Sequence, residues 1–114
     1  MSDLDKLIEA VDAGKRGHGL NTAAVFGDNQ TAMDAVDAFD GSIDAAKALH
    51  DALLPDWVVK QLGQVCIDGS GGWSVWLVAG DYLESCEQAE AKASTPARAW
   101  LLAILRAYRS QVQP

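Results

Sequence analysis

The segment 94–108, STPARAWLLAILRAY, places the strongest constraint on the fold. Thr95 can act as an N-cap whose hydroxyl accepts a hydrogen bond from the first helical turn, and Pro96 falls at the first helical position, where its missing N–H costs nothing. Apolar side chains then recur at the spacing of one helical face, which Trp100 and Leu102 widen. The residues on that face are Ala97, Leu101, Ile104, Leu105 and Tyr108. We therefore predict a core helix over about 95–110 that packs on a sheet or on other helices.

Three shorter helices are expected in the first half of the chain. The first has apolar residues at helical spacing and ends at a glycine, and the second can be capped by an Asp-Asn pair. The third begins after a serine cap and ends before Pro55, because proline disfavours helical geometry in the preceding residue. These helices are predicted at about 2–13, 29–39 and 42–54.

After residue 56 the pattern changes from helical to strand-like. Residues 57–67 are rich in β-branched and aromatic side chains and predict a strand. The glycine-rich stretch 68–72, DGSGG, predicts a flexible hairpin loop, and 73–78 predict the returning strand. Together these segments predict an antiparallel hairpin.

The returning strand of this hairpin is apolar on both faces. Trp73, Val75 and Leu77 share one face, and Trp76 and Val78 share the other. This pattern fits either a central strand or a sheet that helices cover on both sides. The helix ending before Pro55 is accordingly expected either to flank the C-terminal helix or to cover the opposite face.

Residues 82–93, YLESCEQAEAKA, are ambiguous between helix and strand. Their helix propensity is high, but an isolated hairpin is only marginally stable and a third strand would complete a sheet. We predict a strand from about 86 to 92. The predicted fold class is α+β, with an antiparallel sheet of two to three strands within about 57–92 packed with helices at 42–54 and 95–110.

Charge is concentrated in one half of the chain. Residues 1–56 hold eleven acidic and four basic residues and carry the whole net charge of −7, whereas residues 57–114 are neutral. Binding to bare nucleic acid needs basic clusters, and the sequence has none. The acidic half favours either a basic partner or simple solubility.

Two groups of residues are candidates for binding. If the helices at 29–39 and 42–54 were nearly collinear, four aspartates would form an acidic stripe; the alternative is an ordinary solvated face. Trp76 would anchor a partner if its sheet face is open, because tryptophan is enriched in interface hot spots; the alternative is core packing. The four aspartates are Asp37, Asp40, Asp44 and Asp51.

No catalytic or metal-binding signature is present in the sequence. Cys66, Cys86, His18 and His50 show neither CxxC nor HxxxH spacing, and no GxSxG, Walker or GxGxxG element occurs. We expect no metal, no cofactor and no enzymatic activity, with His50 at the surface or boundary of its helix. A cysteine nucleophile at Cys66 or Cys86 is the third and weakest hypothesis.

The composition also bounds the location of the protein. No apolar run approaches the roughly 18 residues that a membrane span needs. The acidic, amphipathic start MSDLDKLIEA differs from a secretion signal, and two cysteines are too few for a disulfide scaffold. We expect a cytoplasmic protein without a membrane contact, folded as one domain over 1–114.

Two segments resemble a known family. Residues 39–57, FDGSIDAAKALHDALLPDW, and 95–108, TPARAWLLAILRAY, are similar to small phage and prophage proteins described as having a phage ABA-sandwich domain. In that family an alanine-rich helix ends at a Leu-Pro-x-Trp element, a short meander follows, and a (Thr/Asn)-Pro-Ala-Arg-Ala-Trp helix closes the domain. The resemblance implies an α–β–α core over 39–112, with 1–38 as a helical extension, and an origin in a phage or prophage. It brings no catalytic residues.

These observations give a leading and a second functional hypothesis. The first is a non-enzymatic phage or prophage accessory protein that binds a host or phage protein in the host cytoplasm, with a homodimer as one form. The second is an inhibitor of a host defence complex, of the anti-CRISPR type. In the second case the acidic half would present carboxylates to a basic nucleic-acid channel, where phosphates normally lie.

Overall fold

Four helices and three strands form the part of the chain that the computed structural model describes, residues 3–14, 25–26, 29–67, 70–79 and 88–112. The strands form one antiparallel sheet in the order β1-β2-β3, which confirms the predicted α+β class. The helices are α1 (Asp3–Ala13), α3 (Asn29–Phe39), α4 (Ile43–Leu53) and α5 (Pro96–Val112), and the strands are β1 (Trp57–Ile67), β2 (Ser70–Ala79) and β3 (Gln88–Ala93).

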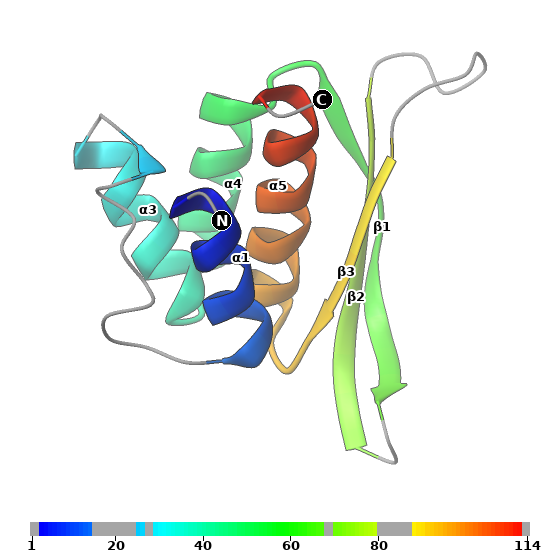
Figure 1. The fold of residues 1–114 in the computed structure, drawn as a ribbon. Coiled ribbons are helices and arrows are strands. Elements are labelled where there is room, and N and C mark those ends of the chain that lie inside the picture. Colours follow the sequence, from blue (N-terminus) through cyan, green and yellow to red (C-terminus); the bar gives the residue numbers. More distant parts are fainter. Residues whose placement is uncertain (1–2, 15–24, 27–28, 68–69, 80–87, 113–114) are drawn as a thin grey trace.

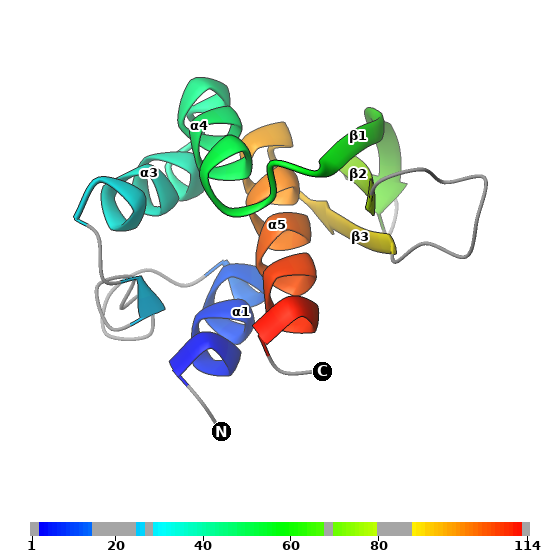
Figure 2. The same cartoon turned by 90° about the horizontal axis from the view of Figure 1, so that it is seen from above.

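Helix α5 is the centre of the fold. It contacts each of the other six elements, and Figures 1 and 2 show it between the sheet and the other three helices. From Ala97 to Ala107 every residue except Arg98 and Arg106 is buried. A helix that is apolar on nearly all sides must be enclosed in this way. The prediction of a core helix is therefore confirmed.

The helix ends follow the predicted capping. Thr95 Oγ1 accepts a hydrogen bond from the backbone N–H of Arg98 at 3.2 Å, and Ser42 Oγ accepts one from Ala45 at 3.1 Å. The C-terminal end of α4 is closed by a 2.7 Å bond from the Leu54 N–H to the His50 carbonyl. Each cap satisfies a backbone group that the helix itself leaves unpaired.

Strands β1 and β2 form a longer hairpin than the sequence predicts. Pairing continues to Ile67 and Ser70, so residues 70–72 belong to β2 and the predicted loop at 68–72 is too long. The glycine pattern predicts a loop there, but cross-strand pairing with 65–67 holds residues 70–72 in the sheet. The described pairing of β1 with β2 shifts register between Val59 and Gln61, which makes Lys60 a bulged residue.

The described part of the ambiguous segment, residues 88–93, is a strand. β3 pairs with β2 over its whole length, and its side chains alternate between exposed and buried. Three alanines of β3 lie on the side that α5 covers. Pairing and burial thus override the helix propensity of these residues. The predicted start near residue 86 falls outside the described residues.

All four helices lie on the same side of the sheet (Figures 1 and 2). Helix α4 packs on α3 and α5, so it flanks the central helix rather than covering the far face. Helices α1 and α3 also contribute to the core cluster around α5, through residues such as Leu7 and Ala35. The two-sided coverage considered for the sheet does not occur among the described helices.

None of the helices in the described ranges is long and apolar enough to span a membrane.

Truncating the central helix should cost far more than truncating the edge strand. Leu101 on α5 is 1% exposed, so Leu101→Ala should lower the free energy of unfolding by about 3 kcal/mol through lost burial and a residual cavity. Leu62 on β1 makes a matched control because the same truncation there removes a side chain that is 39% exposed. Urea unfolding followed by circular dichroism measures both. Equal losses in the two variants would contradict the central role of α5.

Candidate protein-binding surface

The sheet face that points away from the helices carries Trp76 at its centre. Trp76 lies on the middle strand, opposite Gln61 of β1 and Glu90 of β3. Its indole N–H donates to Gln88 Oε1 at 3.0 Å, which fixes the ring against β3. The side chain is partly exposed. A tryptophan whose ring is fixed in this way between polar neighbours resembles the anchor residues of protein interfaces.

The residues around Trp76 make a mixed surface. Val58 and Val78 form an apolar pair at one end of this face, and Ser74 and Lys92 form a polar pair towards the other. Val78 is buried, while Val58 is largely exposed. We call the set Val58, Gln61, Trp76, Val78 and Glu90 the outer sheet face. It combines an aromatic centre with a polar rim, as many protein-binding surfaces do.

The four candidate aspartates do not form one stripe. Helices α3 and α4 are not collinear: they lie side by side after a tight turn (Figure 1). Gly41 in that turn has φ of 113°, a backbone conformation that favours glycine. Asp37, Asp40 and Asp44 are exposed around this turn, and Asp51 lies further along α4.

Asp51 forms an ion pair within its own helix. Lys47 Nζ lies 2.9 Å from Asp51 Oδ2, one helical turn away. This hydrogen bond, reinforced by the positive charge of Lys47, lowers the pKa of Asp51 below its ordinary value, while desolvation of the carboxylate opposes the shift. The Asp51 carboxylate is therefore already partly balanced, which weakens it as a binding group for a basic partner.

His50 is a buried linking residue, so its expected place at the surface or boundary of the helix is wrong. It is 6% exposed, and Trp100 Nε1 donates to its Nδ1 at 3.2 Å. Its Nε2 lies 2.8 Å from the Trp57 carbonyl oxygen. Because Nδ1 accepts, the proton is on Nε2 and is donated to Trp57. The imidazole thus joins α4, the start of β1 and α5.

Sequence reasoning missed this link, although its signal was present. The histidine follows an alanine-leucine run, and the two tryptophans end the sequences Leu-Pro-Asp-Trp and Ala-Arg-Ala-Trp. A buried imidazole needs partners for both ring nitrogens, and an indole N–H is a donor that suits a core position. With both nitrogens engaged, His50 has no free nitrogen to activate a cysteine. His18 and Cys86 lie outside the described residues, as does the Cys66 side chain.

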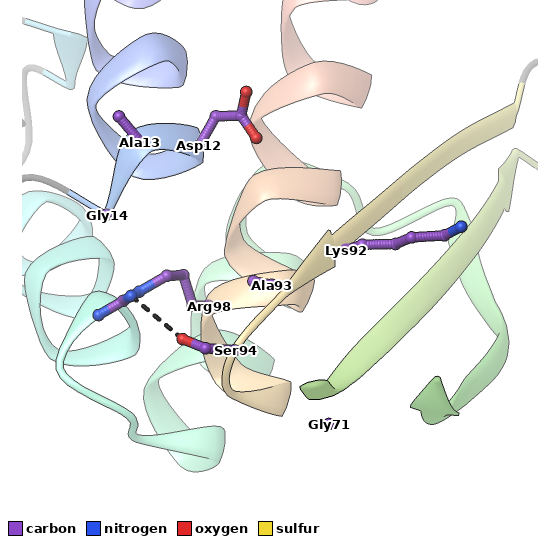
Figure 3. A pocket seen from close by; sticks show the side chains of 8 residues that line it. All are labelled: Asp12, Ala13, Gly14, Gly71, Lys92, Ala93, Ser94 and Arg98. Carbon is purple, nitrogen blue, oxygen red and sulfur yellow. Dashed lines mark hydrogen bonds between the residues drawn. The ribbon is translucent and has the colours of Figure 1, made fainter. Parts of the chain in front are cut away.

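One hollow among the described residues does not assemble a reactive site. It measures about 520 Å³ and lies between the end of α1, the start of β2 and the turn before α5. Figure 3 shows Arg98 directed towards Gly14, while Lys92 extends away from the hollow. Arg98 is held by Ser94 Oγ and the Phe39 carbonyl, each at 3.4 Å, and lies over the Phe39 ring. Its charged groups therefore do not converge on a common point.

Over the described ranges no group of three or more His, Cys, Asp or Glu residues could hold a metal ion.

Comparison with known proteins gave no match. No protein-family model matches the chain, and neither the curated proteins nor the solved structures contain a similar protein at a significant level.

Removing the buried imidazole should loosen the junction of three elements. His50→Ala should lower the free energy of unfolding by about 3 kcal/mol, because it opens a cavity and leaves the Trp57 carbonyl and the Trp100 N–H without partners. His50→Gln can keep the donor to Trp57 and should lose less. Urea titrations followed by tryptophan fluorescence give the two values. A fully stable His50→Ala variant would contradict the linking role.

The pKa of Asp51 should depend on its neighbour. Lys47→Ala removes the hydrogen bond and the nearby positive charge, so the pKa of Asp51 should rise towards its ordinary value. In the wild type the pair stabilises α4 at neutral pH, and this contribution is lost as the pH falls through the lowered pKa. An NMR titration of the Asp51 carboxyl carbon measures the shift. An unchanged pKa in the variant would show that Lys47 is not its cause.

Proposed function

We propose that this protein is a non-enzymatic accessory protein of a phage or prophage that acts by binding another protein through the outer sheet face. The observation that carries the proposal is the position of Trp76. It lies at the centre of a sheet face that none of the described helices covers, and Gln88 holds it in place. Tryptophans so placed supply large contact area at a small entropic cost.

The charges favour a protein partner over nucleic acid. On the three described strands the basic residues are Lys60 and Lys92, and Glu90 accompanies Lys92, so these strands carry no basic cluster for phosphates. The excess of acid in the first half of the chain suits a host or phage protein with a basic surface. Such a partner would be met in the host cytoplasm.

The proposed phage origin rests on the resemblance of two segments, and their contact supports it. Residues 39–57 contain His50 and Trp57, and residues 95–108 contain Trp100. These three residues meet in one buried hydrogen-bonded link. The contact gives a physical reason for the two sequence elements to occur together, since each needs the other to satisfy its buried polar groups.

The acidic inhibitor of a host defence complex is less well supported. Mimicry of a phosphate backbone needs carboxylates in a regular row, whereas Asp37, Asp40 and Asp44 surround a turn and Asp51 is paired with Lys47. The three turn aspartates are exposed and form the remaining basis for this alternative.

The experiment is affinity capture from lysate of the infected host with three forms of the protein. Trp76→Ala should abolish capture of the partner, with at least a tenfold loss of affinity in a direct binding measurement, because hot-spot tryptophans contribute about 2 kcal/mol or more. Met33→Ala, which truncates an exposed apolar residue on α3, is the matched control and should capture normally.

The third form separates the two hypotheses. The triple variant Asp37→Lys, Asp40→Lys, Asp44→Lys should still capture the partner if the outer sheet face binds it. Loss of capture by the triple variant with normal capture by Trp76→Ala would replace the proposal with the acidic inhibitor. Unchanged capture by all variants would show that neither the outer sheet face nor the three turn aspartates bind the partner.

A further inference from the structure

The outer edge of β1 is long, and none of the described strands pairs with it. β1 has 11 residues, lies at one side of the sheet order and pairs with β2 alone among the described strands. The opposite edge strand, β3, has 6 residues, carries Glu90 and Lys92, and its Glu90 carbonyl accepts a 2.7 Å hydrogen bond from Arg106. Edge strands are usually short, charged or covered, because an open edge invites pairing. β3 meets this description along its length, whereas on β1 the charge and the irregular pairing are confined to Lys60, and the segment from Gln61 to Ile67 has neither.

The exposed apolar side chains of β1 lie on both faces of the sheet. Val58 is 47% exposed and lies on the outer sheet face, opposite a valine of β2. Val59 and Leu62 are 38% and 39% exposed and lie on the helix side, opposite buried residues of β2. A partner that docks on one face would leave the other apolar group in water. A strand that adds to the edge covers both at once.

The charge on β1 suits a second copy of this chain. None of the sixteen acidic residues lies on β1, although the chain carries a net charge of −7. Its single charge, Lys60, sits at the register shift between Val59 and Gln61, and no residue from Gln61 to Ile67 is charged. Two β1 strands can therefore approach each other without the repulsion between acids that surfaces formed by residues 1–56 would suffer.

The order of side chains on β1 is self-complementary about Leu62. With Lys60 left out as the bulged residue, Val58 and Val65 each lie three strand positions from Leu62, and both are on the outer side. An antiparallel pair centred on Leu62 therefore places Leu62 against Leu62 and each Val58 against a Val65 of the other copy. Apolar pairs of this kind are the stabilising contacts of a sheet.

We propose that β1 pairs antiparallel with β1 of a second copy about a two-fold axis at Leu62, giving one continuous six-stranded sheet. A C2 axis through the sheet keeps both outer sheet faces on the same side. The dimer then presents two copies of Trp76 on one surface. If the proposed function holds, a repeated or dimeric partner would be bound with increased avidity.

Charge reversal at the axis tests the dimer directly. Leu62→Lys and Leu62→Asp each place two like charges face to face, so each variant alone should be a monomer in analytical ultracentrifugation at concentrations where the wild type is a dimer. Mixing the two variants should restore a dimer, because Lys then faces Asp. Restoration by mixing requires residue 62 of one copy to face residue 62 of the other, which pairing with a foreign strand cannot mimic.

Two further variants keep the test decisive. Met33→Lys adds the same charge at an exposed apolar site on α3 and should leave the dimer intact. If the Leu62 variants fail to unfold cooperatively, Val58→Lys should give a monomer and the double variant Val58→Lys, Val65→Asp should recover the dimer. A wild type that stays monomeric at millimolar concentration, or dimers that persist in both single Leu62 variants, would overturn the proposal.

This outcome is independent of the proposed function. Trp76→Ala should lose the partner and keep the dimer, whereas Leu62→Lys should lose the dimer and keep the outer sheet face. If either partner binding through Trp76 or dimerisation through β1 is disproved, the other proposal is unaffected.

Discussion

The burial of α5 on nearly every side is the constraint on which the rest of the structure depends. A helix with so little polar surface cannot lie at the edge of a protein, so the sheet, α1, α3 and α4 must all be arranged around it. The same requirement places every described helix on the side of α5, so none of them lies on the far face of the sheet. The absence of a described helix from that face is thus a consequence of how the core is enclosed.

Much of this fold could be predicted from local pattern. The caps at Ser42 and Thr95, the strand period after Asp56 and the helical period in each helix all depend on nearby residues, and the structure confirms them. The predictions that failed depend on strand pairing and tertiary packing rather than on local pattern. Residues 70–72 join a strand because residues 65–67 pair with them, and packing places the described helices on one face of the sheet.

For the candidate site, too, local pattern predicted some features, whereas features that depend on tertiary packing were missed. Alternation along β2 correctly separated Trp76 from Val75 and Leu77, but no sequence pattern states which face the helices cover. The predicted acidic stripe required α3 and α4 to be nearly collinear, and the turn at Gly41 sets the angle between these helices. The burial of His50 was not predicted, because it depends on Trp57 and Trp100, which are 7 and 50 residues away in the sequence. Single-chain periodicity carries no information about such pairs.

The place of α5 in the chain has a consequence for biosynthesis. Each of the other described elements precedes Pro96, and each of them contacts α5. A ribosome that has made the sheet and the first three helices has therefore produced a chain whose core still lacks its central member. Until α5 emerges, the apolar faces of these elements stay in water, where chaperones or aggregation compete for them. Folding of this protein is in effect postponed until its last core helix has been translated.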